Sequence, residues 1–361
     1  MASKLNRQGG CGIIAVGTAL ILLLGASSCT DALRARQMRQ ARDAVRGVDR
    51  FMGDWQGRLT MADGTIKPLG AQVMALGNGK YRANLLEEFD RRVKPLVALE
   101  GTVQGDKVRF EGRAEQDAWQ GVSRKGKFTG ALRQGQETHR FVMKRAFRLS
   151  PTLGAEPPTG AVVLFDGKNF DQWKRAGKKP GSDSVRWKLV DGAMEVVRRG
   201  GSIITKKEFT DFKLHLEFRT PFMPDARGQG RGNSGVYLQG RYEVQILDSY
   251  GLEGRDNECG GIYKVAAPRV NMCAAPMQWQ TYDITFYAPR FNADGKKIRN
   301  ARLTVLHNGV KIHKNVEVPG KTGGAAGDKA DRRGGIYLQD HGNPVRFRNI
   351  WLVDLGEKCN E

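Results

Sequence analysis

The residues with the clearest chemical potential lie in one short segment, Gly232–Asp248, where carboxylate, amide and aromatic side chains alternate with apolar ones. The segment reads as two strands joined at Gly240–Arg241, and the side chains of a strand point alternately to its two faces. Glu243 and Gln245 therefore share one face of the second strand, opposite Val244. Such a face suits a sugar, because carboxylates and amides bond hydroxyls while an aromatic ring packs on the apolar side of a pyranose.

Further segments repeat this alternation, which argues against the alternative that the polar residues only face solvent. Apolar and polar residues alternate in Phe212–Arg219, and Gly335–Gln339 nearly copies Gly235–Gln239. His341 closes the repeated segment, and arginines alternate with apolar residues in Val345–Arg348. Several strands that each carry one polar, aromatic-bearing face predict a sheet whose concave side is a site.

A series of segments, taken together and in this order, resembles the 3-keto-disaccharide hydrolase domain family over residues 160–355. The segments are Leu164–Trp173, Gly232–Val236, Tyr242–Asp248, Cys259–Tyr263, Trp279–Phe286, Val305–Gly309 and Gly335–His341. The resemblance implies a concanavalin-A-like or laminin-G-like jelly roll, with two curved antiparallel sheets and the site on the concave one.

The activity of this family implies a route that differs from ordinary glycosidases, which pair two carboxylates across an oxocarbenium-like transition state. A ketone at C3 of the sugar acidifies the proton on C2, so that a base removes it, an enolate forms and the glycosidic oxygen leaves from C1. Water then adds to the unsaturated product. Such a site needs a base, a group that holds the enolate and an acid for the leaving oxygen.

Candidates for these roles lie on the polar faces of the predicted strands. Glu243 or His341 is the candidate base and Glu217 the candidate acid, while Arg219 or Arg348 is expected to hold the enolate. The predicted substrate-binding residues are Arg219, Asn233, Tyr237, Gln239, Gln245, Asp248, Tyr337, Gln339 and Arg348. One concave surface is expected to collect the central members of this set, namely Glu217, Arg219, Glu243, Gln245 and His341 with Tyr237 and Tyr337.

Other interpretations of the same residues stay open. Glu217 and Glu243 would form an ordinary glycosidase pair if their strands were neighbours. Glu243, Asp248 and His341 would instead hold a divalent cation, so the need for a metal or cofactor is left unknown. A lectin-like carbohydrate-binding module of the cell surface would use the same fold and the same polar face without catalysis.

The N-terminus has the layout of a bacterial secretory signal over residues 1–28. A positively charged start precedes an apolar stretch, Ile13–Leu24, and the small residues Ala26–Ser28 lead to Cys29. A cysteine after small residues is similar to a lipobox, so lipid attachment at Cys29 is one prediction and ordinary signal cleavage nearby is the alternative. The protein is expected to be exported, and to be periplasmic or anchored to a membrane only through Cys29.

The formal net charge is +21 at pH 7, from 59 Lys and Arg against 38 Asp and Glu. Such an excess is compatible with nucleic acid or an anionic polymer as a partner. The basic residues are scattered through predicted strands and turns, however, and helix-turn-helix, zinc-finger and RNA-recognition signatures do not occur. We therefore expect a basic solvated surface, no nucleic-acid partner, and a glycan or 3-keto-glycoside as the substrate.

The sequence predicts an all-β chain with two domains after the signal. Residues 29–49 are rich in Arg and Ala and predict a short helix or tether. Residues 50–149 show short alternating runs between Gly, Asn and Asp turns, which predicts a small antiparallel barrel or sandwich. A proline-containing linker follows at 150–160, and 161–356 form the jelly roll.

The cysteines of the second domain predict a disulfide. Cys259 and Cys273 lie 14 residues apart, and an oxidising compartment favours a bond between them. Closing a loop of that size would stabilise the fold by roughly 3 kcal/mol. These two alone do not predict a metal site. Cys359 is left near the C-terminus, either as a free thiol or with a partner that the sequence does not identify.

The remaining histidines are interpreted mainly as structural. His307 precedes an Asn-Gly pair, which favours a tight hairpin turn, so His307 and His313 are expected in sheet and turn rather than in catalysis. His215 either lines the site or is a solvated strand residue, and His139 of the first domain is expected to be solvated.

Overall fold

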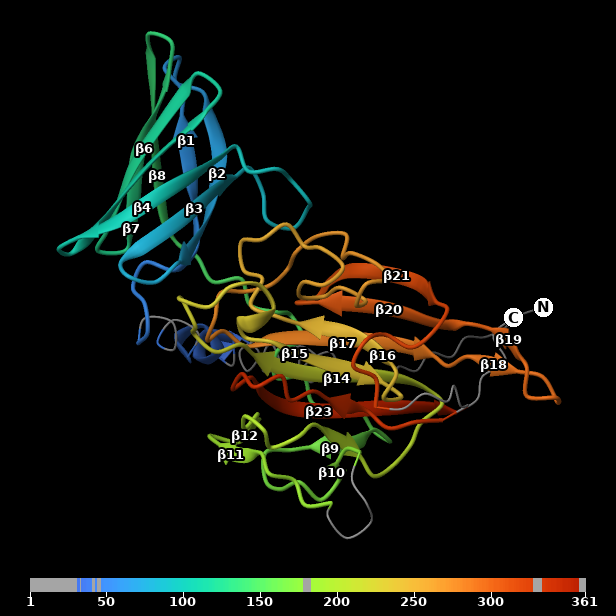
Figure 1. Cartoon of the computed structure of the whole chain (residues 1–361). Coiled ribbons are helices and arrows are strands. Elements are labelled where there is room, and N and C mark those ends of the chain that lie inside the picture. Colours follow the sequence, from blue (N-terminus) through green and yellow to red (C-terminus); the bar gives the residue numbers. More distant parts are fainter. Residues whose placement is uncertain are drawn as a thin grey trace, which may run out of the picture. The chain divides into compact units, whose positions relative to one another are not determined.

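The structure is a computed structural model that describes residues 31–32, 34–40, 43, 47–177, 183–326 and 333–356. It is built almost entirely from antiparallel strands, which confirms the predicted all-β class (Figure 1). The predicted signal segment, Cys29 and Cys359 lie outside the described residues. Residues 34–40 are helical, and the described helical segments are all too short or too polar to cross a membrane.

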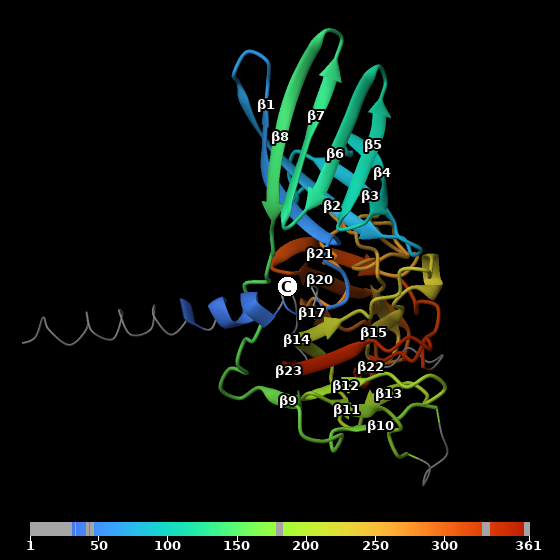
Figure 2. The same cartoon turned by 90° about the vertical axis from the view of Figure 1, so that its left-hand side faces the viewer.

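The first domain is a closed antiparallel barrel in which each strand pairs with its neighbours in sequence and β1 closes against β8 (Figure 2). Its strands are β1 (Gly53–Thr60), β2 (Ile66–Ala75), β3 (Lys80–Leu86), β4 (Val97–Gln104), β5 (Lys107–Ala114), β6 (Asp117–Arg124), β7 (Lys127–Gln134) and β8 (Glu137–Arg145). Closure decides between the barrel and the sandwich that the sequence left open, and it leaves no strand edge of this domain unpaired.

Aromatic side chains fill the interior of the barrel. Phe128 is fully buried and lies edge-on to Trp55 and Phe141, with ring centroids 5.9 and 5.5 Å away. The three rings come from β1, β7 and β8 and all face the barrel interior. This is expected when alternate residues of each strand point inward. The prediction that His139 is solvated is wrong: it is buried, and its Nδ1 accepts a hydrogen bond from the backbone N–H of Ala62 at 2.9 Å.

The second domain consists mainly of two antiparallel sheets, which we call the front sheet and the back sheet. The front sheet has the order β10 (Trp173–Arg175), β13 (Ile203–Thr205), β22 (Tyr337–Leu338), β15 (Ser234–Leu238) and β16 (Tyr242–Ile246). The back sheet has the order β11 (Lys188–Val190), β12 (Ala193–Glu195), β23 (Arg346–Gly356), β14 (Asp211–Arg219), β17 (Gln280–Tyr287), β20 (Ala301–His307) and β21 (Val310–Val318), with β9 (Val162–Phe165) beside β23. A small ribbon is formed by β18 (Arg290–Phe291) and β19 (Lys297–Arg299).

The two sheets pack face to face through the apolar sides of their central strands. Tyr242 of β16 contacts Phe286 of β17 with ring centroids 5.6 Å apart, and Phe212 of β14 lies 5.0 Å from Phe286. The hydroxyl of Tyr282 on β17 donates to the carbonyl of Gln245 on β16 at 2.7 Å. The predicted two-sheet sandwich is therefore confirmed, and the polar faces of the two sheets point away from each other.

The predicted disulfide between Cys259 and Cys273 is wrong, because both are buried free thiols. The sulfur of Cys259 lies 3.3 Å from the hydroxyl of Tyr282, and the thiol of Cys273 donates to the carbonyl of Leu247 at 3.5 Å. Each thiol thus has a polar neighbour within the sandwich core, and the expected compartment alone was not enough to predict a bond.

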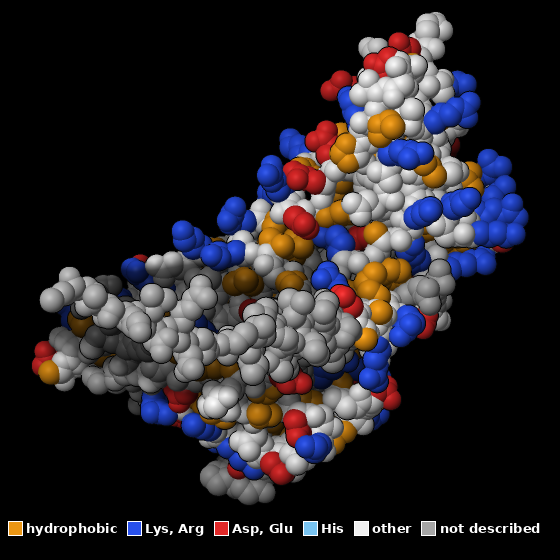
Figure 3. All heavy atoms as spheres, turned by 180° about the vertical axis from the view of Figure 1, so that it is seen from behind, with side chains coloured by type: hydrophobic (Ala, Val, Ile, Leu, Met, Phe, Trp, Pro, Cys, Tyr) orange, Lys and Arg blue, Asp and Glu red, His pale blue; other side chains and the backbone are white. Residues whose placement is uncertain are grey.

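Basic side chains are spread over the protein surface. The face in Figure 3 shows Lys and Arg over both the barrel and the sandwich, mixed with acidic and uncharged side chains. On this face the basic residues are therefore scattered, as the sequence predicted, and they do not form a single positive patch.

Removal of the Phe286 ring tests the inter-sheet core. We expect Phe286→Ala to lower the free energy of unfolding by about 3–5 kcal/mol, because the substitution leaves a cavity between the sheets. Urea titration of the full chain measures this change. Leu252→Ala is the control, since Leu252 is 46% exposed and its loss is expected to change stability by less than about 0.5 kcal/mol. Equal losses in the two variants would contradict this account of the core.

Candidate functional site

The best candidate site lies on the outer side of the front sheet, where Glu243 of β16 and Tyr237 of β15 are directly opposite in register. Opposite residues of an antiparallel pair lie side by side on one face, and here both are buried, at 2% and 0% exposure. A Cβ on Gly235 would lie 2.4 Å from Oε1 of Glu243 and 2.9 Å from the Tyr237 ring. The carboxyl group therefore rests directly over Gly235, and only glycine leaves room for it.

Burial raises the pKa of Glu243 to about 8, and a hydrogen bond with the Tyr237 hydroxyl only partly offsets this effect. The same hydroxyl accepts a hydrogen bond from Nε2 of Gln339 at 3.1 Å and donates to the carbonyl of Gly323 at 2.9 Å. A phenol has one proton to donate, and the geometry directs that proton to Gly323, so Tyr237 opposes the effect of burial on Glu243 only weakly. With a pKa of about 8, Glu243 is mainly protonated and neutral near pH 7.

Aromatic rings and a loop enclose this pair. Tyr337 lies edge-on to Tyr237 with ring centroids 4.9 Å apart. The segment Thr322–Gly324 passes over the site: the Thr322 hydroxyl accepts the backbone N–H of Glu243 at 3.0 Å, and a Cβ on Gly324 would lie 2.5 Å from the Tyr237 hydroxyl. The sequence analysis missed this segment, because nothing in its composition connects it with a strand more than 70 residues away.

Tyr263 is a second residue that the sequence analysis did not assign to the site. Its backbone N–H donates to the Glu243 carbonyl at 3.2 Å, and a Cβ on Gly323 would lie 3.4 Å from its ring. Tyr263 belongs to the motif Cys259–Tyr263, so its presence in a recognisable segment was the available signal.

Buried amides lie next to Glu243 on the same face. Gln245 is two residues further along β16, and Asn233 precedes β15. Both are 1% exposed, and the side-chain N–H groups of both donate to Oε1 of Gln229, at 3.2 Å from Gln245 and 3.1 Å from Asn233. The structure therefore brings together Asn233, Tyr237, Glu243, Gln245, Tyr337 and Gln339 of the predicted residues.

Gln239 and Asp248 lie at the ends of the same two strands, but their side chains are occupied elsewhere. Gln239 is in the turn, one residue before the predicted joint, with φ +53°, and its Nε2 donates to the carbonyl of Phe209 at 2.9 Å. Asp248 pairs with Nε of Arg231 at 2.5 Å, although burial raises its pKa. We find both to be structural residues of the hairpin and of the loop that follows it.

His341 is exposed on the loop after β22, and no contact joins it to Glu243 within the described ranges. The set considered for a divalent cation is therefore not assembled, since Asp248 is paired with Arg231 and His341 lies at the surface. Across the part of the chain that the structure describes, no group of three or more His, Cys, Asp or Glu residues could hold a metal ion.

Glu217, Arg219 and Arg348 lie on the outer side of the back sheet, across the sandwich from Glu243. The expectation that they converge with Glu243 on one surface is therefore wrong, as is the alternative of a Glu217–Glu243 pair on neighbouring strands. Alternation correctly predicted that these side chains point away from the core. It does not say which of two packed sheets a strand joins, and that assignment separates the two carboxylates.

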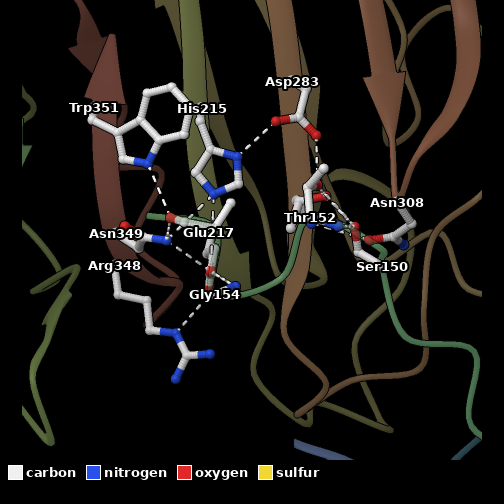
Figure 4. Close-up of polar contacts among 12 residues, drawn as sticks. Ser150, Thr152, Gly154, His215, Glu217, Asp283, Asn308, Arg348, Asn349 and Trp351 are labelled. Atoms are coloured by element: carbon white, nitrogen blue, oxygen red, sulfur yellow. Dashed lines mark hydrogen bonds and ion pairs between the residues drawn. The ribbon is translucent and has the colours of Figure 1, made fainter. Parts of the chain in front are cut away.

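Glu217 is fully buried and holds the linker rather than facing the candidate site (Figure 4). Its carboxylate accepts hydrogen bonds from Nε of Arg348 at 2.6 Å, from the amide of Asn349 at 3.1 Å and from the backbone N–H of Gly154 at 2.5 Å. Burial by itself would raise its pKa, but His215 and Arg348 outweigh burial and lower it. Glu217 is therefore an ionised anchor for residues that follow the barrel.

His215 continues this anchor and is neither solvated nor part of the front-sheet site. Its Nδ1 lies 2.6 Å from Oδ1 of Asp283, and its ring stacks on Trp351 with centroids 4.9 Å apart. The Thr152 hydroxyl donates to the other oxygen of Asp283 at 2.7 Å, as Figure 4 shows. Burial would lower the pKa of His215, but Asp283 and Glu217 raise it.

Arg219 and Arg348 also surround a tryptophan on the back sheet. The guanidinium carbons of Arg348 and Arg219 lie 4.1 and 5.1 Å from the ring centroid of Trp279. Burial and the neighbouring Arg346 and Arg348 lower the pKa of Arg219 to about 10. These cations therefore have an aromatic partner of their own, on the opposite side of the sandwich from Glu243.

Residues 160–353 match the sequence model of the 3-keto-alpha-glucoside-1,2-lyase-like domain. The 3-keto-disaccharide hydrolase of Bacteroides thetaiotaomicron is 26% identical over 242 residues, which cover 53% of this chain and 77% of that protein. A solved structure named as a putative glycosyl hydrolase from Parabacteroides distasonis is 36% identical, covers 55% of this chain and 84% of that one, and has a TM-score of 0.49. Another from the same organism is 21% identical, covers 54% and 94%, and has a TM-score of 0.41.

The raised pKa of Glu243 predicts a pH-dependent cost to stability. The unfolded chain releases this proton near pH 4.5 while the folded protein keeps it to about pH 8, so rising pH favours unfolding over that range. We expect the stability of Glu243→Gln relative to the parent protein to increase by about 4 kcal/mol between pH 5 and pH 8. Urea titrations at both pH values measure this, and an unchanged difference would show that Glu243 has an ordinary pKa.

Loss of the Glu217 carboxylate tests its role as an anchor. We expect Glu217→Ala to lower the free energy of unfolding by about 3–5 kcal/mol, because it removes the buried acceptor of Arg348, Asn349 and the linker N–H of Gly154. Glu253→Ala is the matched control, since the Glu253 side chain is 62% exposed and exposed pairs contribute at most about 1 kcal/mol. Thermal and urea unfolding of both variants decide the matter, and a loss no larger than that of the control would refute the anchor.

Proposed function

The chain belongs to the 3-keto-alpha-glucoside-1,2-lyase-like domain family, and on that premise we propose that its front-sheet site cleaves the glycosidic bond of 3-keto-glycosides. The observation that carries the proposal is the buried carboxyl of Glu243, with a pKa raised to about 8 beside the Tyr237 hydroxyl. A group with a pKa near the working pH is suited to general acid–base catalysis. The name of the Bacteroides relative supports the same class of substrate.

In the proposed reaction Glu243, in its ionised form, takes the proton from C2 of the sugar. The electron pair of the C2–H bond forms an enolate with the C3 ketone. The enolate then re-forms the ketone, a C1–C2 double bond forms, and the C1–O bond breaks with its electrons going to the leaving oxygen, which takes a proton. Water finally adds across C1 and C2, placing hydroxyl on C1 and a proton on C2.

The residues around Glu243 have supporting roles in this proposal. The Tyr237 hydroxyl holds the carboxyl in place and is itself positioned by Gln339 and Gly323. Protonated Glu243 becomes a proton donor after it has taken the C2 proton, so one residue serves both as base and as acid. This replaces the separate acid, Glu217, that the sequence analysis expected, because Glu217 is bound to the linker.

The test is turnover of a 3-keto-glucoside by Glu243→Gln, which keeps the shape of the side chain and removes its basicity. We expect the rate to fall by about 10²–10⁴-fold, the usual contribution of a general acid–base group, with binding largely retained. In the parent protein kcat/KM is expected to rise with pH up to about 8, because only ionised Glu243 accepts the proton. Glu100→Gln is the control, since its side chain is 61% exposed on the barrel.

Two outcomes would count against the proposal. Full activity of Glu243→Gln would remove Glu243 from the mechanism. Binding of glycosides without turnover of any 3-keto-glycoside by the parent protein would favour a lectin-like module, which could use the same polar face.

A further inference from the structure

We propose that the candidate site recognises its substrate through two amide oxygens, Oδ1 of Asn233 and Oε1 of Gln245, each accepting a hydrogen bond from a hydroxyl group of the sugar. The inference rests on the proposed function, because it concerns the same site. Both oxygens are buried, and neither has a hydrogen-bond partner in the part of the chain that the structure describes. Buried polar atoms in native proteins are rarely left unpaired, so these two point to a partner from outside the chain.

The orientation of these amides follows from their neighbours. Nε2 of Gln229 donates to the backbone carbonyl of Asn257 at 2.8 Å, so Oε1 of Gln229 faces the opposite way. That oxygen accepts from Nδ2 of Asn233 and from Nε2 of Gln245. Nδ2 of Asn233 also donates to the backbone carbonyl of Gln229 at 2.7 Å. Carbonyl oxygens cannot donate, so rotating either amide by 180° would set oxygen against oxygen.

The two free positions are therefore acceptors, which defines the chemistry of the ligand. Sugar hydroxyls are donors and match them, whereas a carboxylate or phosphate group would present only further acceptors. Gln245 is two residues from Glu243 on the same face of β16, so the recognised hydroxyls belong to the sugar unit that carries the reacting carbons. We infer a neutral, hydroxyl-bearing 3-keto-glycoside rather than an acidic or phosphorylated one.

The residue that orients the two amides, Gln229, is the central residue of the 3-10 turn η1 (Gly228–Gly230). Gly228 and Gly232 flank Gln229 with φ of +49° and +60°, a region that glycine enters without a steric cost. A Cβ on Gly228 or Gly230 would meet no atom within 4 Å, so the outer side of the turn is open. Gln229 is thus a positioning residue, because its Oε1 fixes the orientation of both amides.

The test compares one 3-keto-glucoside with analogues that each lack a single hydroxyl, at C4 or at C6. Gln245→Met keeps the length of the side chain and removes the acceptor. We expect its KM for the complete substrate to rise about 10- to 100-fold, the range for an unpaired buried hydrogen-bonding group, with a much smaller change in kcat. On the analogue that lacks the partner hydroxyl, the same substitution should have no further effect.

Matched variants separate recognition from folding. Gln229→Ala removes the acceptor that orients both amides, so it frees the amides to rotate and should weaken binding. Gln56→Met on the exposed side of β1 is the control for a Gln-to-Met change. Thermal unfolding confirms that each variant is folded before KM is compared.

Calorimetric titration with methyl glucoside and its deoxy analogues makes this inference separable from the proposed reaction. If no 3-keto-glycoside is turned over, the proposed function fails, yet a loss of glucoside affinity in Gln245→Met that disappears with one deoxy analogue still supports the two acceptors. An equal penalty on complete and deoxy ligands would overturn the inference. So would calcium binding that Gln245→Met abolishes while sugar affinity stays unchanged, because the oxygens would then be cation ligands.

Discussion

The packing of two sheets on one apolar core is the constraint on which the rest of the second domain depends. Tyr242 and Phe286 meet between the sheets, and this contact commits every alternate residue of β16 and β17 to the interior. The residues between them must point outward, on opposite sides of the sandwich. The second domain therefore has two separate polar faces, and the segments packed on each face determine the environment of its polar residues.

The two central glutamates show how neighbouring residues set the pKa of a buried carboxyl group. Glu217 and Glu243 are both buried, so loss of hydration raises the pKa of each carboxyl. Around Glu217, His215 and Arg348 more than offset this effect and keep the carboxylate ionised. Among the described residues, the neutral Tyr237 hydroxyl is the one group that opposes burial of Glu243, so the carboxyl keeps its proton to about pH 8. The first arrangement is an anchor, and the second is suited to proton transfer.

The linker owes its position to the anchor on the back sheet. Residues 150–155 donate and accept hydrogen bonds along that face, with Gly154 on Glu217 and Thr152 on Asp283. A proline-containing stretch of this kind reads as a spacer, but its Gly154 N–H and Thr152 hydroxyl bind the carboxylates of Glu217 and Asp283.

The sequence by itself determined the all-β class, the alternation of each strand and the family, because these depend on local pattern and on motifs within single segments. It also indicated that Tyr237, Tyr337, Glu243 and Gln245 share a polar face. Tyr237 and Tyr337 lie in two near-identical strands, and Glu243 and Gln245 lie in the strand that pairs with the first of these. Only the tertiary structure decided which sheet each strand joins, and this moved Glu217 to the opposite side of the sandwich. Contacts between distant parts of the chain likewise had no local signal. The segment over Tyr237 and the partners of His215 lie far away in the sequence. These contacts, and not the residue types, set the protonation state of each group.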